Sequence, residues 1–158
     1  MDSDRLRLLE ARWRLWEIEV DELHEVADDL LTAGEDSPAL IRLFCLDRDE
    51  LPWEGRAAFE NLLEEWGCGD LSFPEAAEVI SLDMARGLLS GRVTADEVLR
   101  RAEAINLPTF YMLDALAEWG VLADEFSWHD SHPYIGRELS DIETSTIELA
   151  RSIVERHS

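Results

Sequence analysis

Lysine is absent from this sequence. Fourteen Arg residues carry all of its fixed positive charge against 36 Asp and Glu residues, and the formal net charge is -22 over 158 residues. Proteins that bind nucleic acid contact its phosphates with Lys and Arg, so this balance excludes direct nucleic-acid binding. Carboxylates at this density also repel one another in the folded state, which indicates a surface adapted to a strongly basic partner.

Long hydrophobic runs are also missing. No stretch of about 18 apolar residues occurs, so we expect no membrane-spanning helix. The first ten residues, MDSDRLRLLE, lack the apolar segment and cleavage site of a signal peptide, and we expect a cytoplasmic protein. Cysteine occurs only at Cys45 and Cys68, without the spacing of a metal site. In a cytosolic protein both are expected to be buried or half-buried free thiols, and a disulfide between them remains an alternative.

Motifs for catalysis are scarce. The sequence has no nucleophile motif and no glycine-rich phosphate loop, so we expect a protein without enzymatic activity or cofactor. The ten residues Glu22–Leu31, ELHEVADDLL, resemble the acidic helices that hold magnesium in all-helical nucleotide pyrophosphohydrolases, but no second acidic helix with matching spacing is evident. His129 and His132 are the other candidate metal ligands, and no further ligands accompany them.

Apolar residues recur at spacings of three and four throughout, which predicts an all-α fold. Pro and Gly stand where helices begin and end. We expect a compact bundle of about six to eight helices in a single domain, residues 1–158, with long first and last helices packed antiparallel. The segment 120–133 is expected to be irregular or only briefly helical. The predicted helices span residues 3–33, 38–44, 52–66, 73–88, 94–102, 108–119 and 134–156.

The predicted first helix carries two apolar stripes. One is an unbroken heptad seam that runs from Leu6 to Leu30. The other lies on nearly the opposite face of the first half, and a helix that is apolar on both sides belongs in a core or an interface. A homodimer through this second stripe is therefore an alternative. The second stripe consists of Leu8, Ala11, Leu15 and Ile18.

The acidic residues are concentrated in two stretches without Arg. Residues 15–41 hold nine carboxylates and residues 102–136 hold six, while four Arg residues cluster before residue 15. Trp128 lies among the acids of the second stretch, where an aromatic side chain is typical of an interface anchor. The candidate partner-binding residues are Asp21, Glu22, Glu25, Asp28, Asp29, Asp124, Glu125, Trp128 and Asp130.

Residues 79–101, VISLDMARGLLSGRVTADEVLRR, resemble part of the colicin-D-type bacterial immunity protein family. In that family a helix ends in a Ser-Gly turn, and the next helix begins with a Thr or Ser cap and an acidic first turn. The resemblance implies a small acidic helical protein that sequesters a basic toxin nuclease. The matching residues here are Leu88, Leu89, Ser90, Gly91, Val93, Thr94, Ala95, Asp96, Glu97 and Val98.

Charge and resemblance favour the same class of function. We expect a non-enzymatic acidic protein that sequesters a basic protein, most plausibly an immunity protein or antitoxin acting on a toxin. A self-associating structural or regulatory helical module is the first alternative, and a metal-dependent hydrolase is the second. The hypothesis depends on whether the two acidic stretches form one face.

Overall fold

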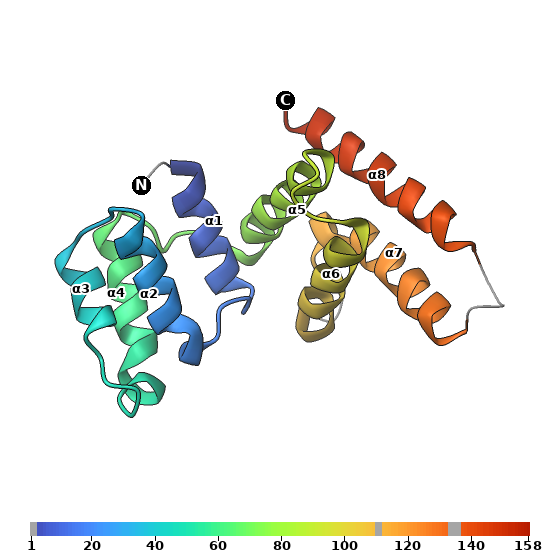
Figure 1. Cartoon of the computed structure of the whole chain (residues 1–158). Helices are drawn as coiled ribbons and strands as arrows, with labels where there is room; N and C mark the ends of the chain where they lie inside the picture. Colours follow the sequence, from blue (N-terminus) through green and yellow to red (C-terminus); the bar gives the residue numbers. More distant parts are fainter. Residues whose placement is uncertain (1–2, 110–111, 133–136) are drawn as a thin grey trace. The chain divides into compact units, whose positions relative to one another are not determined.

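The chain is all-helical. A computed structural model describes residues 3–109, 112–132 and 137–158, and every regular element in these ranges is helical (Figure 1). The described residues form eight α-helices and two short helical turns, which confirms the predicted fold class. The chain divides into two compact units, Met1–Ser72 and Phe73–Ser158, and each is described by itself. The predictions of a single domain and of antiparallel first and last helices concern both units together and stay predictions.

The first unit, unit 1, is built from four α-helices and two short turns. Helix α3 begins at Pro38, and the Ser37 hydroxyl accepts a hydrogen bond from the backbone N–H of Leu40 at 3.1 Å, as an N-cap does. Gly67, at φ +75°, follows the last helix and ends it as the sequence predicts. The elements are α1 (Ser3–Arg14), η1 (Val20–Glu22), α2 (Leu23–Thr32), α3 (Pro38–Phe44), η2 (Leu51–Gly55) and α4 (Arg56–Glu65).

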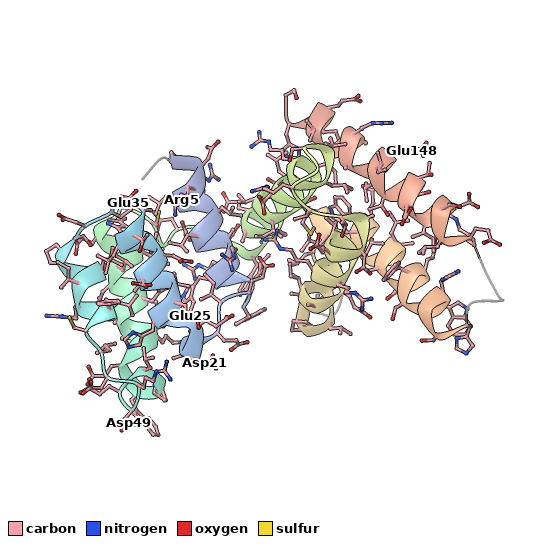
Figure 2. All side chains as sticks on the ribbon, viewed as in Figure 1. Arg5, Asp21, Glu25, Glu35, Asp49 and Glu148 are labelled. Atoms are coloured by element: carbon pink, nitrogen blue, oxygen red, sulfur yellow. The ribbon has the colours of Figure 1, made fainter. Side chains whose placement is uncertain are left out.

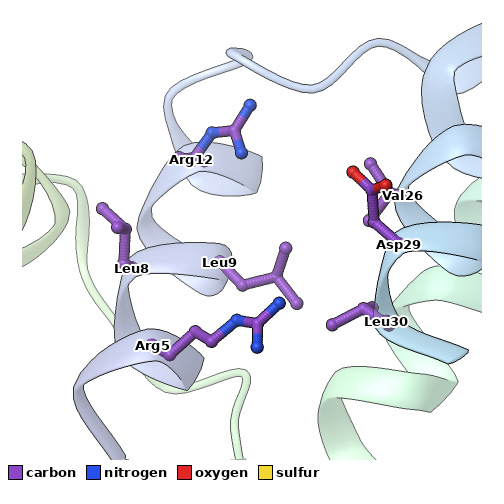
Figure 3. Close-up of a pocket in the computed structure, with 7 residues that line it drawn as sticks. All are labelled: Arg5, Leu8, Leu9, Arg12, Val26, Asp29 and Leu30. Atoms are coloured by element: carbon purple, nitrogen blue, oxygen red, sulfur yellow. The ribbon is translucent and has the colours of Figure 1, made fainter. Parts of the chain in front are cut away.

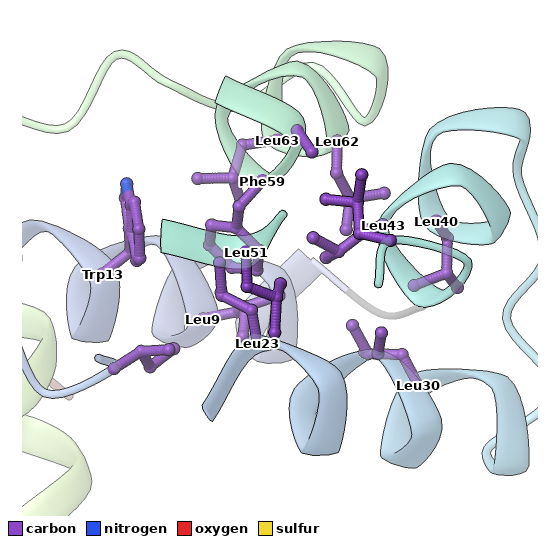
Figure 4. Packing of buried hydrophobic residues seen from close by; sticks show 14 residues of the cluster. Leu9, Trp13, Leu23, Leu30, Leu40, Leu43, Leu51, Phe59, Leu62 and Leu63 are labelled. Carbon is purple, nitrogen blue, oxygen red and sulfur yellow. The ribbon is translucent and has the colours of Figure 1, made fainter. Parts of the chain in front are cut away.

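One apolar cluster holds unit 1 together. Phe59 on α4 is fully buried, and its ring lies 4.7 Å from that of Trp13 on α1. Arg56 covers the outer side of Trp13, with its guanidinium 5.3 Å from the ring. Helices α2 and α3 pack against each other, and α3 packs against α4. The cluster in Figure 4 includes Leu9, Trp13, Leu23, Leu30, Leu40, Leu43, Leu51, Phe59, Leu62 and Leu63.

The predicted helix over residues 3–33 is wrong in its continuity. Helix α1 ends at Arg14, and helical structure resumes only at η1. Trp16 takes a left-handed conformation with φ +58°, and the N–H of Glu17 reaches the carbonyl of Arg12 at 2.8 Å. These features form a Schellman-type helix end with Trp in the place that Gly usually takes. The break turns the chain, so that the apolar faces of α1 and α2 both enter the same core.

A buried carboxylate fixes the last loop of unit 1. Glu10 on α1 is only 3% exposed, and its Oε1 accepts hydrogen bonds from the backbone N–H groups of Gly69 at 3.0 Å and Leu71 at 2.8 Å. Arg14 donates to the carbonyl of Gly69. These contacts join residues about sixty positions apart in sequence, so they tie α1 to the end of the unit.

The second unit, unit 2, is built from four longer helices. Helix α5 packs against α7 and α8, and α6 packs against α7. Trp119 is fully buried, and its indole N–H donates to the Ser81 hydroxyl at 2.9 Å. The Thr94–Glu97 capping box is formed as predicted, with the Thr94 N–H 2.7 Å from the Glu97 carboxylate. The elements are α5 (Phe73–Leu89), α6 (Ala95–Thr109), α7 (Asp114–Ser131) and α8 (Leu139–Arg156).

The prediction that residues 120–133 are irregular or only briefly helical is wrong over residues 120–131, because α7 continues to Ser131. Gly120 lies inside this helix and is buried. A glycine inside a helix costs about 1 kcal/mol, and the burial of Leu116, Trp119 and Ala123 on the same helix outweighs that cost. Trp128 therefore lies on a helix rather than in a loop.

Two helices that were predicted to begin at Pro108 and Tyr134 have different boundaries in the structure. Pro108 lies in the last turn of α6 rather than at the start of a new helix. The hydroxyl of Thr109 bonds back to the carbonyl of Ile105 at 3.0 Å, which satisfies a carbonyl near this helix end. The predicted start of the last helix at Tyr134 lies outside the described residues. Helix α8 begins at Leu139, after Glu138 in an extended conformation.

Replacement of Glu10 by Ala tests its structural role. The two backbone N–H groups lose their acceptor, so the free energy of unfolding should fall by about 2–4 kcal/mol. Glu10→Gln keeps one acceptor oxygen and should lose less. Glu60→Ala is the control, because its ion pair with Arg56 is exposed and 3.4 Å long, and the change should stay within about 0.5 kcal/mol. Urea denaturation measures all three, and equal effects of Glu10→Ala and Glu60→Ala would contradict the role of Glu10.

Candidate partner-binding surface

Unit 1 presents the first acidic stretch to solvent. Helix α2 turns its apolar residues to the core, so the intervening carboxylates occupy its outer side. All five predicted residues of this stretch are exposed, and they come from two consecutive elements, η1 and α2. We call this surface the acidic face. It consists of Asp21, Glu22, Glu25, Asp28 and Asp29.

None of the five carboxylates of the acidic face forms an ion pair with a residue that the structure describes. Glu22 accepts a hydrogen bond from the backbone N–H of Glu19 at 2.7 Å, which caps η1. Glu25 and Asp29 are four residues apart on α2, a spacing at which like charges destabilise a helix by a few tenths of a kcal/mol. Figure 2 labels Asp21 and Glu25 on this surface.

Two arginines lie beside one edge of the acidic face. Arg5 and Arg12 of α1 line a cleft of about 180 Å³ opposite Asp29 of α2, and Leu9 and Leu30 are among its apolar lining residues (Figure 3). This places part of the predicted arginine cluster beside Asp29, at the C-terminal end of the acidic face. The other end of the face, at η1, faces a different set of neighbours.

Those neighbours are on η2, and they include a residue that sequence reasoning missed. Elements η1 and η2 pack together. Trp53 on η2 is 85% exposed, more than any other large hydrophobic residue that the structure describes. It stands among Asp49, Glu50 and Glu54, which are exposed as well. The sequence DRDELPWE, in which a Trp follows a Pro among acids, could have indicated an exposed Trp. The predicted helix over residues 52–66 did not indicate the direction of this side chain, because Trp53 lies on η2.

The second acidic stretch has a different character. Glu125 pairs with Arg137 at 2.8 Å, so part of its charge is neutralised within unit 2. Trp128 is 54% exposed, and its ring stacks on that of His132 at 4.3 Å. Asp124 is exposed, and the side chain of Asp130 lies outside the described structure. The two stretches belong to different units, so each is considered as a surface of its own, and unit 1 offers the stronger one.

In unit 2, an acidic residue on α5 is paired with two Arg side chains of the same unit. Asp83 on α5 bonds to Arg101 at 2.7 Å and to Arg92 at 2.9 Å. Partial burial raises the pKa of Asp83, but hydrogen bonds from Arg101 and Arg92 and their charges outweigh burial and hold the pKa below its ordinary value. This carboxylate is therefore ionised and paired with Arg at neutral pH. The carboxylates of the acidic face, by contrast, form no ion pair with a described residue.

The candidate metal ligands do not form a recognised ligand group. Over residues 3–109, 112–132 and 137–158, no three His, Cys, Asp or Glu side chains converge as a metal site requires. The carboxylates of Glu22, Glu25 and Asp29 point to solvent, and His132 stacks on Trp128. No observation in the described structure favours the hydrolase alternative.

The stripe proposed for a homodimer offers little free surface. Ala11, Leu15 and Ile18 are each less than 5% exposed, and Leu8 is half-buried. A dimer seam requires apolar side chains that are exposed in the monomer. No observation therefore favours self-association through this stripe.

Both cysteines are free thiols, as predicted. The expected burial is confirmed for Cys68, which is half-buried beside Glu10, and is wrong for Cys45, which is exposed. Burial, followed by the negative charge of Glu10 and a hydrogen bond to it, raises the pKa of the Cys68 thiol. A thiol that stays protonated is a poor nucleophile, so Cys68 lacks the activation of a catalytic cysteine.

Comparison with protein-family models, curated proteins and solved structures finds no match to this chain. Among the described helices, none combines the length and apolar character needed to cross a membrane. Functional inference therefore rests on the surface chemistry of the chain itself.

Alkylation tests the environment of Cys68. With iodoacetamide near neutral pH, Cys45 should react about tenfold faster than Cys68, because only a small thiolate fraction forms at Cys68. Glu10→Gln removes the nearby charge and should accelerate alkylation of Cys68. The rate at Cys45 serves as the control for folding, and mass spectrometry of tryptic peptides measures both. Equal rates at the two cysteines in the unaltered protein would contradict this assignment.

The Asp83 pair predicts a pH-dependent contribution to stability. Because the pKa of Asp83 is lower in the folded chain than its ordinary value of 3.8, its stabilisation is present above about pH 4 and is lost as the pH falls through the folded pKa. Asp83→Asn should lower the free energy of unfolding by about 1–2 kcal/mol at neutral pH, and the difference should shrink in acid. Asp96→Asn, whose pair with Arg100 is exposed, is the control and should change little at either pH. A difference that grows in acid would contradict the pairing.

Proposed function

We propose that this chain is a non-enzymatic binding protein that sequesters a basic protein, and that the partner is a toxin which it neutralises. The observation that carries the proposal is the acidic face: five exposed carboxylates without an ion pair to any described residue. Ion pairing within the described chain does not account for this arrangement, and carboxylates four residues apart on a helix, such as Glu25 and Asp29, repel. A cationic partner surface would relieve this repulsion when the complex forms.

The proposed mechanism combines electrostatic steering of the basic partner with steric blocking of its active surface. Unit 1 holds 20 acidic residues against seven Arg, and a field of this sign accelerates encounter with a cationic protein. The carboxylates would occupy the positions that nucleic-acid phosphates take on a basic nuclease, and the bulk of the chain would cover its active surface.

The immunity function is supported by the segment that resembles the colicin-D-type family. The turn and cap on which that resemblance rests are formed: Gly91 has φ +72°, and Thr94 and Glu97 cap α6. Both features are common helix-boundary motifs, so they add to the argument from charge and do not replace it.

Charge reversal tests the proposal. The combined variant Asp21→Arg, Glu25→Arg and Asp28→Arg should weaken capture of a basic partner and flatten the dependence of capture on salt, because it removes the attractive field at the contact. The tagged full chain is used to capture protein from native lysate at about 50 mM and about 500 mM salt, and captured proteins are identified by mass spectrometry.

A matched variant provides the control. Glu143→Arg, Glu148→Arg and Glu155→Arg change the net charge by the same amount on exposed positions of α8 in unit 2. This control should retain most of the capture at low salt. If both variants behave alike, overall charge rather than the acidic face governs binding. If the unaltered chain captures no basic protein at low salt, the proposed function is wrong.

A further inference from the structure

We propose that the partner docks on the η1–η2 end of unit 1, and that the indole of Trp53 inserts into an apolar pocket of the basic partner. This inference rests on the proposed function and adds the location of the contact and a second requirement on the partner. The partner must offer an apolar pocket surrounded by positive charge, not positive charge alone.

Exposure of Trp53 is the first observation. Its side chain is 85% exposed, while Trp13 and Trp119 are buried in the cores of their units. An indole is among the largest apolar groups that a protein can bury, and Trp is enriched among the residues that dominate binding energies. An isolated Trp that the fold leaves in water is therefore suited to act as an anchor.

The backbone that carries Trp53 is fixed in position. The N–H of Trp53 donates to the carbonyl of Glu50 at 3.0 Å. The residue two before it, Leu51, and the residue two after it, Gly55, are both buried. A Cβ added at Gly55 would lie 3.1 Å from Val20, so η2 sits tightly against η1. An anchor held in this way loses little conformational freedom on binding.

The chemistry around Trp53 selects the class of partner. Asp49, Glu50 and Glu54 flank it on the same segment, where Arg48 is the one cation between residues 47 and 55. The packing of η1 on η2 adds the first two carboxylates of the acidic face, Asp21 and Glu22, to this end of the unit. Negative charge around the indole opposes an anionic lipid surface and a second copy of this chain. It favours a cationic protein surface with a hydrophobic recess.

Two synthetic peptides of equal positive charge serve as probes. One alternates Arg with Gly, and the other alternates Arg with Leu. The full chain should bind both in a salt-dependent manner and should bind the Arg–Leu peptide about tenfold more tightly, because its Leu side chains add apolar contact with the indole that Gly cannot supply. Trp53→Ala should abolish this preference while binding to the Arg–Gly peptide remains. Isothermal titration measures the affinities.

Trp128→Ala is the matched control, because Trp128 is also an exposed Trp but lies on α7 in unit 2. It should keep the preference for the Arg–Leu peptide. If Trp53→Ala keeps the preference, or if Trp128→Ala removes it, the inference is wrong while the proposed function stands. If the unaltered chain binds neither peptide at low salt, the proposed function itself fails. Sedimentation of the unaltered chain and of Trp53→Ala should show no difference, and a dimer that depends on Trp53 would overturn the inference in favour of self-association.

Discussion

Repulsion among carboxylates is the constraint that this protein must accommodate, because 36 acidic residues face 14 Arg residues in any fold. Unit 2 places Asp83 and Glu125 against Arg side chains, where charge stabilises the fold. In unit 1 the carboxylates of η1 and α2 form no ion pair with a residue that the structure describes. The acidic face is thus a surface where an external cation would relieve repulsion.

The apolar core of unit 1 is what holds this surface in place. Trp13 and Phe59 pack at its centre, and the left-handed turn at Trp16 brings α1 and α2 into the same cluster. The same turn leads into η1, whose packing on η2 fixes the segment that carries Trp53. The charged surface and the backbone that carries the exposed indole are therefore held in place by the packing of one unit.

Helical periodicity and capping residues were sufficient to predict most of the fold. The Ser37 cap, the Thr94–Glu97 box and the stop at Gly67 all form, because their hydrogen bonds and φ angles are local. The break at Trp16 escaped prediction, since a left-handed conformation is uncommon for any residue other than Gly and the local pattern does not mark a Trp for it. Continuation of α7 through Gly120 was missed because it depends on the burial of Trp119 and Ala123 in the folded unit.

The candidate surface was predicted in part. Exposure of Glu25, Asp28 and Asp29 follows from the apolar face of α2, so the sequence pattern was sufficient to predict that these side chains are exposed. The roles of Glu125 and Trp128 depended on Arg137 and His132, which approach them only in the folded unit. Trp53 was missed because its direction depends on η2, a π-helical turn that sequence periodicity does not reveal.

Hydrogen exchange of the full chain, with and without the basic partner captured at low salt, tests the central claim most directly. Binding through the acidic face and Trp53 predicts that amide protection increases over residues 19–29 and 47–55. Protection confined to α7 and α8, with residues 19–29 and 47–55 unchanged, would contradict it.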